Sequence, residues 1–241
     1  MRRHRVYADI KLQPGQTAKL PATPSRHLIQ VLRLRDGDHV QAFNGDGHDY
    51  EAEITASAKD STELRVLERG EPETECPLRL HLAIGISKGE RMDYVIQKAV
   101  ELGIHSITPL FTDRCVARLQ GERLEKRLTH WRGVLIGACE QSGRRRLPQL
   151  LAACRLEDWL QQGLPGVLLD HRATQSLPQL ARPSGDFALL VGPEGGLAAS
   201  EREQAEATGL TSVRLGPRVL RTETAPLAAL AAIQVLWGDM G

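Results

Sequence analysis

The sequence predicts an α/β protein with a mostly parallel sheet and helices on both of its faces, preceded by a small β-rich barrel. Up to residue 72, short apolar runs alternate with glycine-containing turns, which is typical of strands joined by hairpins. From Leu78 onward, apolar strands alternate with segments of helical periodicity, which is typical of parallel strands connected by helices. We therefore expect a barrel over residues 1–72 and an α/β domain over residues 73–241, with the acidic stretch Gly70–Pro77 as the linker.

A hairpin is the clearest element of the N-terminal module. The alternating segments His39–Phe43 and His48–Ile54 flank the turn Asn44-Gly45-Asp46-Gly47. Thr62–Leu67 predicts a further strand, and Ser25–Leu34 predicts one helix. Together these elements predict a compact β-barrel with a single helix.

The larger domain begins with a strand and then alternates. We expect strands at Leu78–Ile86, Ile104–Leu110, Val167–Asp170, Phe187–Val191 and Ser212–Leu215. We expect helices at Glu90–Leu102, closed by Gly103; along Leu124, Leu128, Trp131, Leu135 and Ala138; from a Ser200–Glu203 capping box to Gly209; and at Ala225–Trp237. The last helix is apolar nearly all round, so it should lie in the core or in a contact between subunits.

The composition excludes several classes of protein. No apolar run approaches the roughly 20 residues that cross a bilayer, and no apolar segment follows the basic start as in a secretory signal. The four cysteines lie far apart without a C-x-x-C pair or a nearby His cluster, which disfavours a zinc site or a redox pair. We expect a cytoplasmic protein with reduced thiols.

Charge is distributed unevenly, although the net charge is only +1. Residues 1–35 hold eight Lys or Arg against one Asp, residues 36–75 hold three against twelve acidic residues, and residues 114–146 hold nine against three. Nearly all these cations are arginine, which binds phosphate at two points and stacks on bases. A solvated helix face is the alternative for the second block, but two basic zones favour an anionic polymer as partner.

Two glycine-bearing loops carry the chemistry. Gly192-Pro193-Glu194-Gly195-Gly196 follows one predicted strand, and Leu215–Pro226 leads from the next strand into the last helix. Ligands of open α/β sheets bind at the carboxyl ends of strands, and glycine lets the backbone approach them closely. Neither loop has the spacing of a phosphate loop or a dinucleotide fingerprint, which disfavours ATP and NAD. The pair predicts a backbone-lined pocket for an adenosine-type ligand, whereas the first loop alone is also explained by a structural turn.

These loops resemble the cofactor loops of the SPOUT methyltransferases, and in particular those of the RsmE family. The resemblance extends through His27–Asp38, Lys88–Gly103 and Ala138–Arg144 with Pro148, and so covers nearly the whole chain. It implies an enzyme that uses S-adenosylmethionine to methylate N3 of one uridine, at position 1498 of 16S ribosomal RNA in the small ribosomal subunit. It also implies a PUA-like barrel that docks RNA, a deep trefoil knot around the cofactor, and a homodimer.

We therefore predict three groups of site residues, and we expect neither a metal ion nor a membrane partner. The predicted cofactor-binding residues are Leu169, Gly192, Glu194, Gly195, Gly196, Leu215, Gly216, Leu220, Arg221, Thr224 and Ala225. The predicted RNA-binding residues are Arg2, Arg3, Arg5, His27, Arg33, Arg114, Arg144 and Arg145.

Catalysis at N3 of uridine requires loss of the N3 proton, so a base and an anion stabiliser are needed. Arg221 is the candidate to hold developing negative charge or the target phosphate, and Glu223 or Glu140 is the candidate proton acceptor. A structural ion pair with Glu223 is the alternative role of Arg221, and helix-surface solvation or packing is the alternative for Glu140. Two other functions stay open: a related SPOUT enzyme acting on another RNA or on a ribose hydroxyl, and a non-catalytic RNA-binding factor of ribosome assembly.

Overall fold

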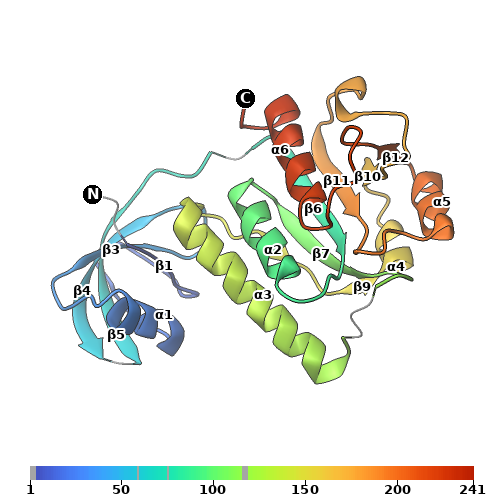
Figure 1. Cartoon of the computed structure of the whole chain (residues 1–241). Coiled ribbons are helices and arrows are strands. Elements are labelled where there is room, and N and C mark those ends of the chain that lie inside the picture. The colour runs from blue at the N-terminus through green and yellow to red at the C-terminus, as the bar shows by residue number, and fades with distance from the viewer. Residues whose placement is uncertain (1–3, 59, 75, 116–118) are drawn as a thin grey trace. The chain divides into compact units, whose positions relative to one another are not determined.

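A computed structural model of the chain describes residues 4–58, 60–74, 76–115 and 119–241 (Figure 1). It divides into two compact units. The first unit comprises Met1–Glu75 together with Cys139–Leu147, and the second comprises Cys76–Ala138 together with Pro148–Gly241. No sequence pattern indicated that residues 139–147 would group with the first unit.

The sheet of the first unit has five strands in the order β1-β3-β4-β5-β2. They are β1 (Arg5–Tyr7), β2 (Thr17–Leu20), β3 (His39–Phe43), β4 (Tyr50–Ala58) and β5 (Ser61–Arg69). β1 runs parallel to β3, and the other pairs are antiparallel. The predicted hairpin is confirmed as β3 and β4, and its turn contains Gly45 and Gly47 at φ values of +89° and +93°. Glycine takes such positive φ values without the strain that a Cβ atom would cause.

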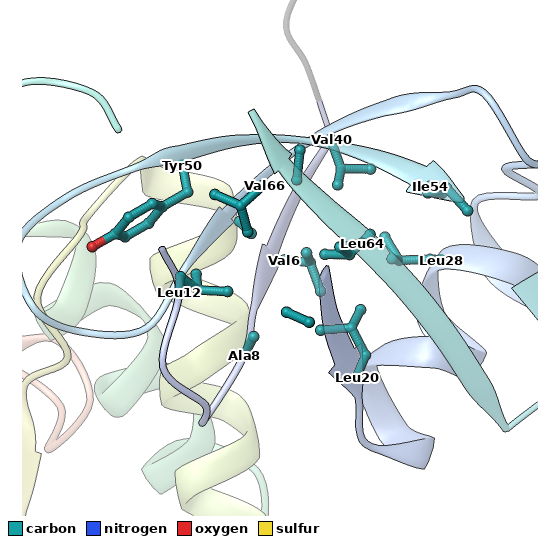
Figure 2. Packing of buried hydrophobic residues seen from close by; sticks show 13 residues of the cluster. Val6, Ala8, Leu12, Leu20, Leu28, Val40, Tyr50, Ile54, Leu64 and Val66 are labelled. Atoms are coloured by element: carbon teal, nitrogen blue, oxygen red, sulfur yellow. The ribbon is translucent and has the colours of Figure 1, made fainter. Parts of the chain in front are cut away.

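Alternate residues of these strands fill one apolar core (Figure 2). Val6 of β1, Val40 of β3, Ile54 of β4 and Leu64 of β5 are fully buried in it. Burying each such side chain stabilises the fold by about 1.5–3 kcal/mol. The first unit therefore has a hydrophobic core of its own.

The helix of the first unit differs from the prediction of one helix over Ser25–Leu34. α1 (Ala22–Arg26) begins earlier and passes into a single π-helical turn, η1 (His27–Val31). The Leu32 N–H donates to the His27 carbonyl, five residues back, which widens the turn. Arg33 then takes a φ of +59°, so the helix has ended before the predicted boundary.

The sheet of the second unit is parallel at every strand pairing. Its strands are β6 (Leu78–Gly85), β7 (Ser106–Phe111), β8 (Gln149–Leu150), β9 (Cys154–Arg155), β10 (Gly166–Leu169), β11 (Gly185–Val191) and β12 (Leu210–Val213). The order is β12-β10-β11-β6-β7-β8, and β9 also pairs with β7. Thus β10 lies between β11 and β12, although β11 and β12 are consecutive in the chain.

Helices cover both faces of this sheet. They are α2 (Arg91–Glu101), α3 (Gly121–Ser142), α4 (Leu156–Leu160), α5 (Ala199–Ala207) and α6 (Ala225–Trp237), with a 3-10 turn η2 (Leu177–Gln179). α2 packs beside α6 and α4 packs against α5 (Figure 1). Ala188 and Leu190 of β11 share a core with residues of α4 and α5, whereas Leu189, which points to the other face, is also fully buried. The predicted parallel sheet with helices on both faces is confirmed; the trefoil knot stays a prediction.

The start of α5 corrects one predicted cap. Ser200 and Glu203 were expected to form a capping box, but Ser200 lies inside the helix and Ala198 is the N-cap residue. The Glu201 carboxylate accepts the Ala198 N–H at 2.7 Å and the Asp113 N–H at 2.8 Å. A buried glutamate therefore caps the helix, and it also fastens the chain that follows β7. The predicted strand Ser212–Leu215 is likewise shifted, because Leu210–Val213 is the segment that pairs with β10.

α6 is only partly covered by its own unit. Pro226, Leu230 and Ile233 are buried, but Val235 is 55% exposed and Leu236 is 42% exposed. No helix in the described parts of the chain is long and apolar enough to cross a membrane.

Candidate functional site

The carboxyl ends of three adjacent parallel strands meet at one cavity of about 470 Å³. Leu169 and the two residues after it extend from β10, residues 192–197 follow β11, and residues between 214 and 225 lead from β12 into α6. All of these belong to the second unit. Small ligands of open parallel sheets bind at this edge, in cavities of about this size. We call it the loop cavity.

Backbone forms much of the wall of the loop cavity. A Cβ atom on Gly192 would lie 2.9 Å from both the carbonyl carbon of Gly196 and the backbone nitrogen of Leu197. Gly196 has a φ of +67°, and Gly216 on the facing loop has a φ of +84°. These glycines let the loop after β11 close on itself, and they leave main-chain amides and carbonyls next to the space.

Arg91, the first residue of α2, bridges two carboxylates at the loop cavity. Its Nη1 donates to Oε1 of Glu194 at 2.8 Å, and its Nε lies 3.7 Å from Oε2 of Glu223. The Lys88 backbone N–H also donates to Glu194, at 2.9 Å. Burial opposes ionisation of Glu194, but hydrogen bonds from the Lys88 N–H and Arg91 keep its pKa below the ordinary value. Glu194 is therefore a held, ionised carboxylate at neutral pH.

Arg221 stands at the rim, with a side chain that is 82% exposed. Its Nη1 lies 3.9 Å from Oε1 of Glu223, which is a long and solvent-screened ion pair. The neighbouring Thr222 donates from Oγ1 to the Gly192 carbonyl at 3.1 Å, and this bond joins the two glycine loops. The structure thus brings Arg221 and Glu223 together and leaves the guanidinium accessible to an external ligand.

Ten of the eleven predicted cofactor-binding residues line the loop cavity. They are Leu169, Gly192, Glu194, Gly195, Gly196, Leu215, Gly216, Leu220, Arg221 and Ala225. Thr224 does not line it; this residue is the N-cap of α6, where its carbonyl accepts the Ala228 N–H. Contact between these residues and a cofactor stays a prediction.

Sequence reasoning missed Arg91, Asp170 and His171, which also line the cavity. Asp170 Oδ2 pairs with Nε of Arg202 at 3.1 Å, so its carboxylate is fixed at the end of β10. An acidic residue at the end of an apolar strand could have marked Asp170 as a candidate site residue. Asp170 reaches the cavity because β10 lies between β11 and β12, which the order of the strands in the chain does not indicate.

Arg114, predicted to bind RNA, contacts the first glycine loop. The Arg114 Nη1 donates to the Gly195 carbonyl at 3.1 Å. A Cβ atom added to Gly195 would lie 3.0 Å from the Cβ atom of Arg114. A side chain at residue 195 would therefore meet Arg114. Arg114 therefore supports the loop, whatever else it contacts.

Arg5 corrects the predicted RNA surface of the first unit. Its side chain is 6% exposed and donates to Oδ1 of Asp49 at 2.5 Å and to the Arg144 carbonyl at 2.9 Å. Nε of Arg145 donates to Oδ2 of the same Asp49 at 2.8 Å. Arg5 is therefore an internal cation, and Arg145 is partly committed to the same carboxylate. Sequence counts of charge do not distinguish such paired arginines from surface ones.

The other predicted RNA-binding residues are placed variously. Arg2 and Arg3 lie outside the described residues. Arg33 is exposed and its backbone is in the left-handed region, whereas His27 and Arg144 are half-buried. These residues stay predictions as RNA contacts.

Glu140 belongs to the first unit and does not line the loop cavity. Its Oε1 accepts the Tyr7 N–H at 2.9 Å. Burial raises the pKa of its carboxyl above the ordinary value, against the opposing effects of that hydrogen bond, His27 and Arg5. Glu140 therefore accepts a hydrogen bond within the first unit, and its role as a proton acceptor stays a prediction.

The donor set of the loop cavity fits an adenosine-type ligand. Main-chain amides and carbonyls suit the base and sugar, and the lining carries charges of both signs, with the carboxylates of Asp170, Glu194 and Glu223 beside arginine side chains. Within the described residues, no group of three or more His, Cys, Asp or Glu side chains is arranged to hold a metal ion.

Comparison with known proteins gives the same picture. Residues 74–234 match the family described as "RNA methyltransferase domain", and residues 24–67 match "RNA methyltransferase PUA domain". The ribosomal RNA small subunit methyltransferase E of Buchnera aphidicola is 32% identical over 239 residues, covering 98% of this chain and 97% of that protein.

Solved structures agree over the full length. A ribosomal RNA small subunit methyltransferase E from Neisseria gonorrhoeae, bound to S-adenosylmethionine, has a TM-score of 0.92 and 38% identity, with 100% of both chains covered. A structure described as a methyltransferase from Legionella pneumophila, with the cofactor SAM bound, has a TM-score of 0.96 and 37% identity at the same coverage. The chain belongs to the ribosomal RNA small subunit methyltransferase E family of RNA methyltransferases.

Proposed function

We propose that this protein uses S-adenosylmethionine to methylate N3 of one uridine in 16S ribosomal RNA of the small ribosomal subunit, in the cytoplasm. The observation that carries the proposal is the loop cavity, a glycine-walled space with held carboxylates at the carboxyl edge of a parallel sheet. Two relatives, at 37% and 38% identity, have structures with S-adenosylmethionine bound. The second of them is named a ribosomal RNA small subunit methyltransferase. The position of the uridine rests on the family resemblance of the sequence.

The cofactor would be held by the two glycine loops and the end of β10. Main chain at Gly192 and Gly196, which have no side chains, and at Leu215 would bind its polar edges. When bound, S-adenosylmethionine supplies an electrophilic methyl group. The protein contributes mainly positioning. Once the methyl group and N3 of the uridine are oriented for reaction, removal of the N3 proton is the main further requirement.

Two side chains at the rim fit the remaining chemistry. The exposed guanidinium of Arg221 is placed to stabilise negative charge on a uracil carbonyl as the N3 proton leaves. Glu223, close to both Arg91 and Arg221, is the proton acceptor that the second unit itself supplies at this cavity. General base catalysis of this kind contributes about 10²–10⁴-fold.

The test is to incubate the purified protein and labelled S-adenosylmethionine with small subunits from cells that lack the activity, and then to map the label by mass spectrometry. A single N3-methyluridine supports the proposal. Label on a ribose or on another RNA identifies a related SPOUT activity instead, whereas cofactor binding without transfer indicates a non-catalytic assembly factor. Glu223→Gln should lower kcat while Glu140→Gln preserves it; the opposite order would reverse the assignment of the base.

We also propose that the protein is a homodimer that pairs through α6. Val235 and Leu236 are exposed apolar residues on this helix, and Met240 just beyond it is 50% exposed. Twofold pairing would cover such a surface with its own copy. Leu230 is not a suitable test position, because it is fully buried within the unit and its substitution would unfold the protein.

Val235→Glu is the appropriate test of the dimer, with Ala228→Glu as a second exposed position on the same helix. Sedimentation of the wild type should give twice the 26.6 kDa monomer mass, and the variants should give the monomer mass with folded spectra. A fully active wild-type monomer at low micromolar concentration would refute the dimer.

A further inference from the structure

The first unit contains a cavity of its own, of about 480 Å³, which the proposed chemistry does not use. It is lined by Lys11, Leu12, Gln13, Pro14, Gln16, Asn44, Asp46, Tyr50 and Arg69. These residues come from the segment between β1 and β2, the turn between β3 and β4, the first residue of β4, and the end of β5. We call it the barrel cavity.

Several polar side chains of the barrel cavity have no partner within the described structure. Lys11, Gln13 and Gln16 make no side-chain hydrogen bond or ion pair to a described residue. By contrast, Arg26 pairs with Asp60, and Arg65 pairs with Glu53 at 2.5 Å on the same barrel. The cavity thus concentrates donors and acceptors that the fold itself does not consume.

Two cationic residues line the cavity and suit a phosphate. Lys11 carries an ammonium group without a carboxylate partner among the described residues. Nη2 of Arg69 lies 2.5 Å from Nε2 of the His48 ring, and no ion pair joins Arg69 to a carboxylate among the described residues. Two cations at one cavity attract an anionic ligand.

The lining of the cavity also includes a carboxylate, so it is not suited to phosphate alone. Asp46 accepts the Tyr50 hydroxyl at 2.6 Å and the His48 N–H at 2.9 Å, so an anchored carboxylate faces the same space. Burial and the Asp46 carboxylate raise the pKa of Tyr50 to about 12, so this phenol stays a neutral donor. A carboxylate beside carboxamides recognises N–H groups, such as those on the edge of a nucleobase.

We propose that the barrel cavity binds one unstacked nucleotide of the substrate RNA, with its phosphate toward Lys11 and Arg69 and its base toward Gln13, Gln16 and Asp46. Proteins recognise RNA sequence mainly through such splayed single-stranded bases, which leave their edges open to carboxamides. The identity of the RNA rests on the proposed function. The cavity makes the barrel a reader of a nucleotide other than the one that is methylated.

The experiment measures binding of the full-length protein to a labelled single-stranded oligouridylate by fluorescence anisotropy. The double variant Lys11→Gln with Arg69→Gln should bind about tenfold more weakly, and its dependence on salt should lose about 0.7 log units per log unit of salt for each phosphate contact removed. Lys19→Gln is the matched control, because Lys19 is an exposed lysine of β2 outside the cavity. It should change the affinity less than twofold.

A second variant tests the base side without altering charge. Gln13→Ala with Gln16→Ala should weaken oligouridylate binding about threefold or more and leave binding of inorganic polyphosphate unchanged. Equal losses in the Lys11 and Lys19 variants, or polyphosphate competing as well as RNA, would overturn the proposal.

Failure of this proposal is distinguishable from failure of the proposed function. The cavity variants should keep wild-type affinity for S-adenosylhomocysteine, and methyl transfer to small subunits should show a raised KM with an unchanged kcat. If the wild type transfers no methyl group, the proposed function fails, while the anisotropy result still decides the barrel cavity.

Discussion

Gly192→Ala is the most direct test of the loop cavity. The added Cβ atom would lie 2.9 Å from the Gly196 carbonyl carbon and the Leu197 nitrogen, both of them backbone atoms. Ordinary van der Waals distances begin about 0.5 Å beyond this separation. Because both neighbours are backbone atoms, the loop itself must move, and no side-chain rotation can relieve the overlap. Overpacking of this kind costs about 1–3 kcal/mol. The free protein relieves the overlap by shifting the loop, so the cost appears when the ligand requires the original conformation.

The expected result is a loss of S-adenosylhomocysteine affinity of about 5-fold to 150-fold, measured by isothermal calorimetry. Gly133→Ala is the matched control, because a Cβ atom on Gly133 of α3 meets nothing within 4 Å. That control should bind normally and should be as stable as the wild type or up to about 1 kcal/mol more stable. A folded Gly192→Ala protein that binds within twofold of the wild type would refute the reasoning.

Three further variants test particular contacts. Arg91→Met leaves the carboxylates of Glu194 and Glu223 without their shared cation, and calorimetry should show cofactor affinity about three- to tenfold weaker, a modest effect because the ion pairs are partly exposed. Arg114→Ala removes the bond to the Gly195 carbonyl, so affinities for RNA and for cofactor should both fall; a loss confined to RNA would contradict the loop-supporting role. Glu140→Gln should abolish the contribution of this carboxyl to the pH dependence of the free energy of unfolding. Because the folded-state pKa of Glu140 is raised, wild-type stability should fall as pH rises from the ordinary glutamate value through the raised one, as urea unfolding from about pH 4 to pH 8 would show.

Much of the fold could be predicted because periodicity is a local property. The hairpin around Asn44–Gly47 and the helix Ala225–Trp237 were predicted closely, since alternation and apolar content mark them within a few residues. β1 and β2 were missed because three or four residues are too few to show a period. The split of the predicted helix at His27 depends on backbone geometry, which has no sequence period.

The candidate site was predicted where it lies in contiguous loops and missed where it depends on strand order. The loops after β11 and β12 contain glycines that are recognisable in the sequence as candidate ligand-binding turns. Asp170 and Arg91 reach the same cavity only because β10 inserts between those strands and α2 begins beside them. The burial of Arg5 could not be predicted for a related reason, since its partner Asp49 lies 44 residues away in the chain.

The grouping of residues 139–147 with the barrel has a consequence for how the protein is made. Asp49 is held by Arg5 and also by Arg145, a residue that leaves the ribosome almost a hundred residues later. During synthesis the barrel therefore emerges with a nearly buried carboxylate that still lacks one of its two cations, and it stays incomplete until the whole of α3 and Arg145 beyond it have been translated. A fragment that ends at residue 75 would keep this deficit permanently. Fragments meant to fold alone should carry the 139–147 segment, joined by a linker or supplied as a peptide.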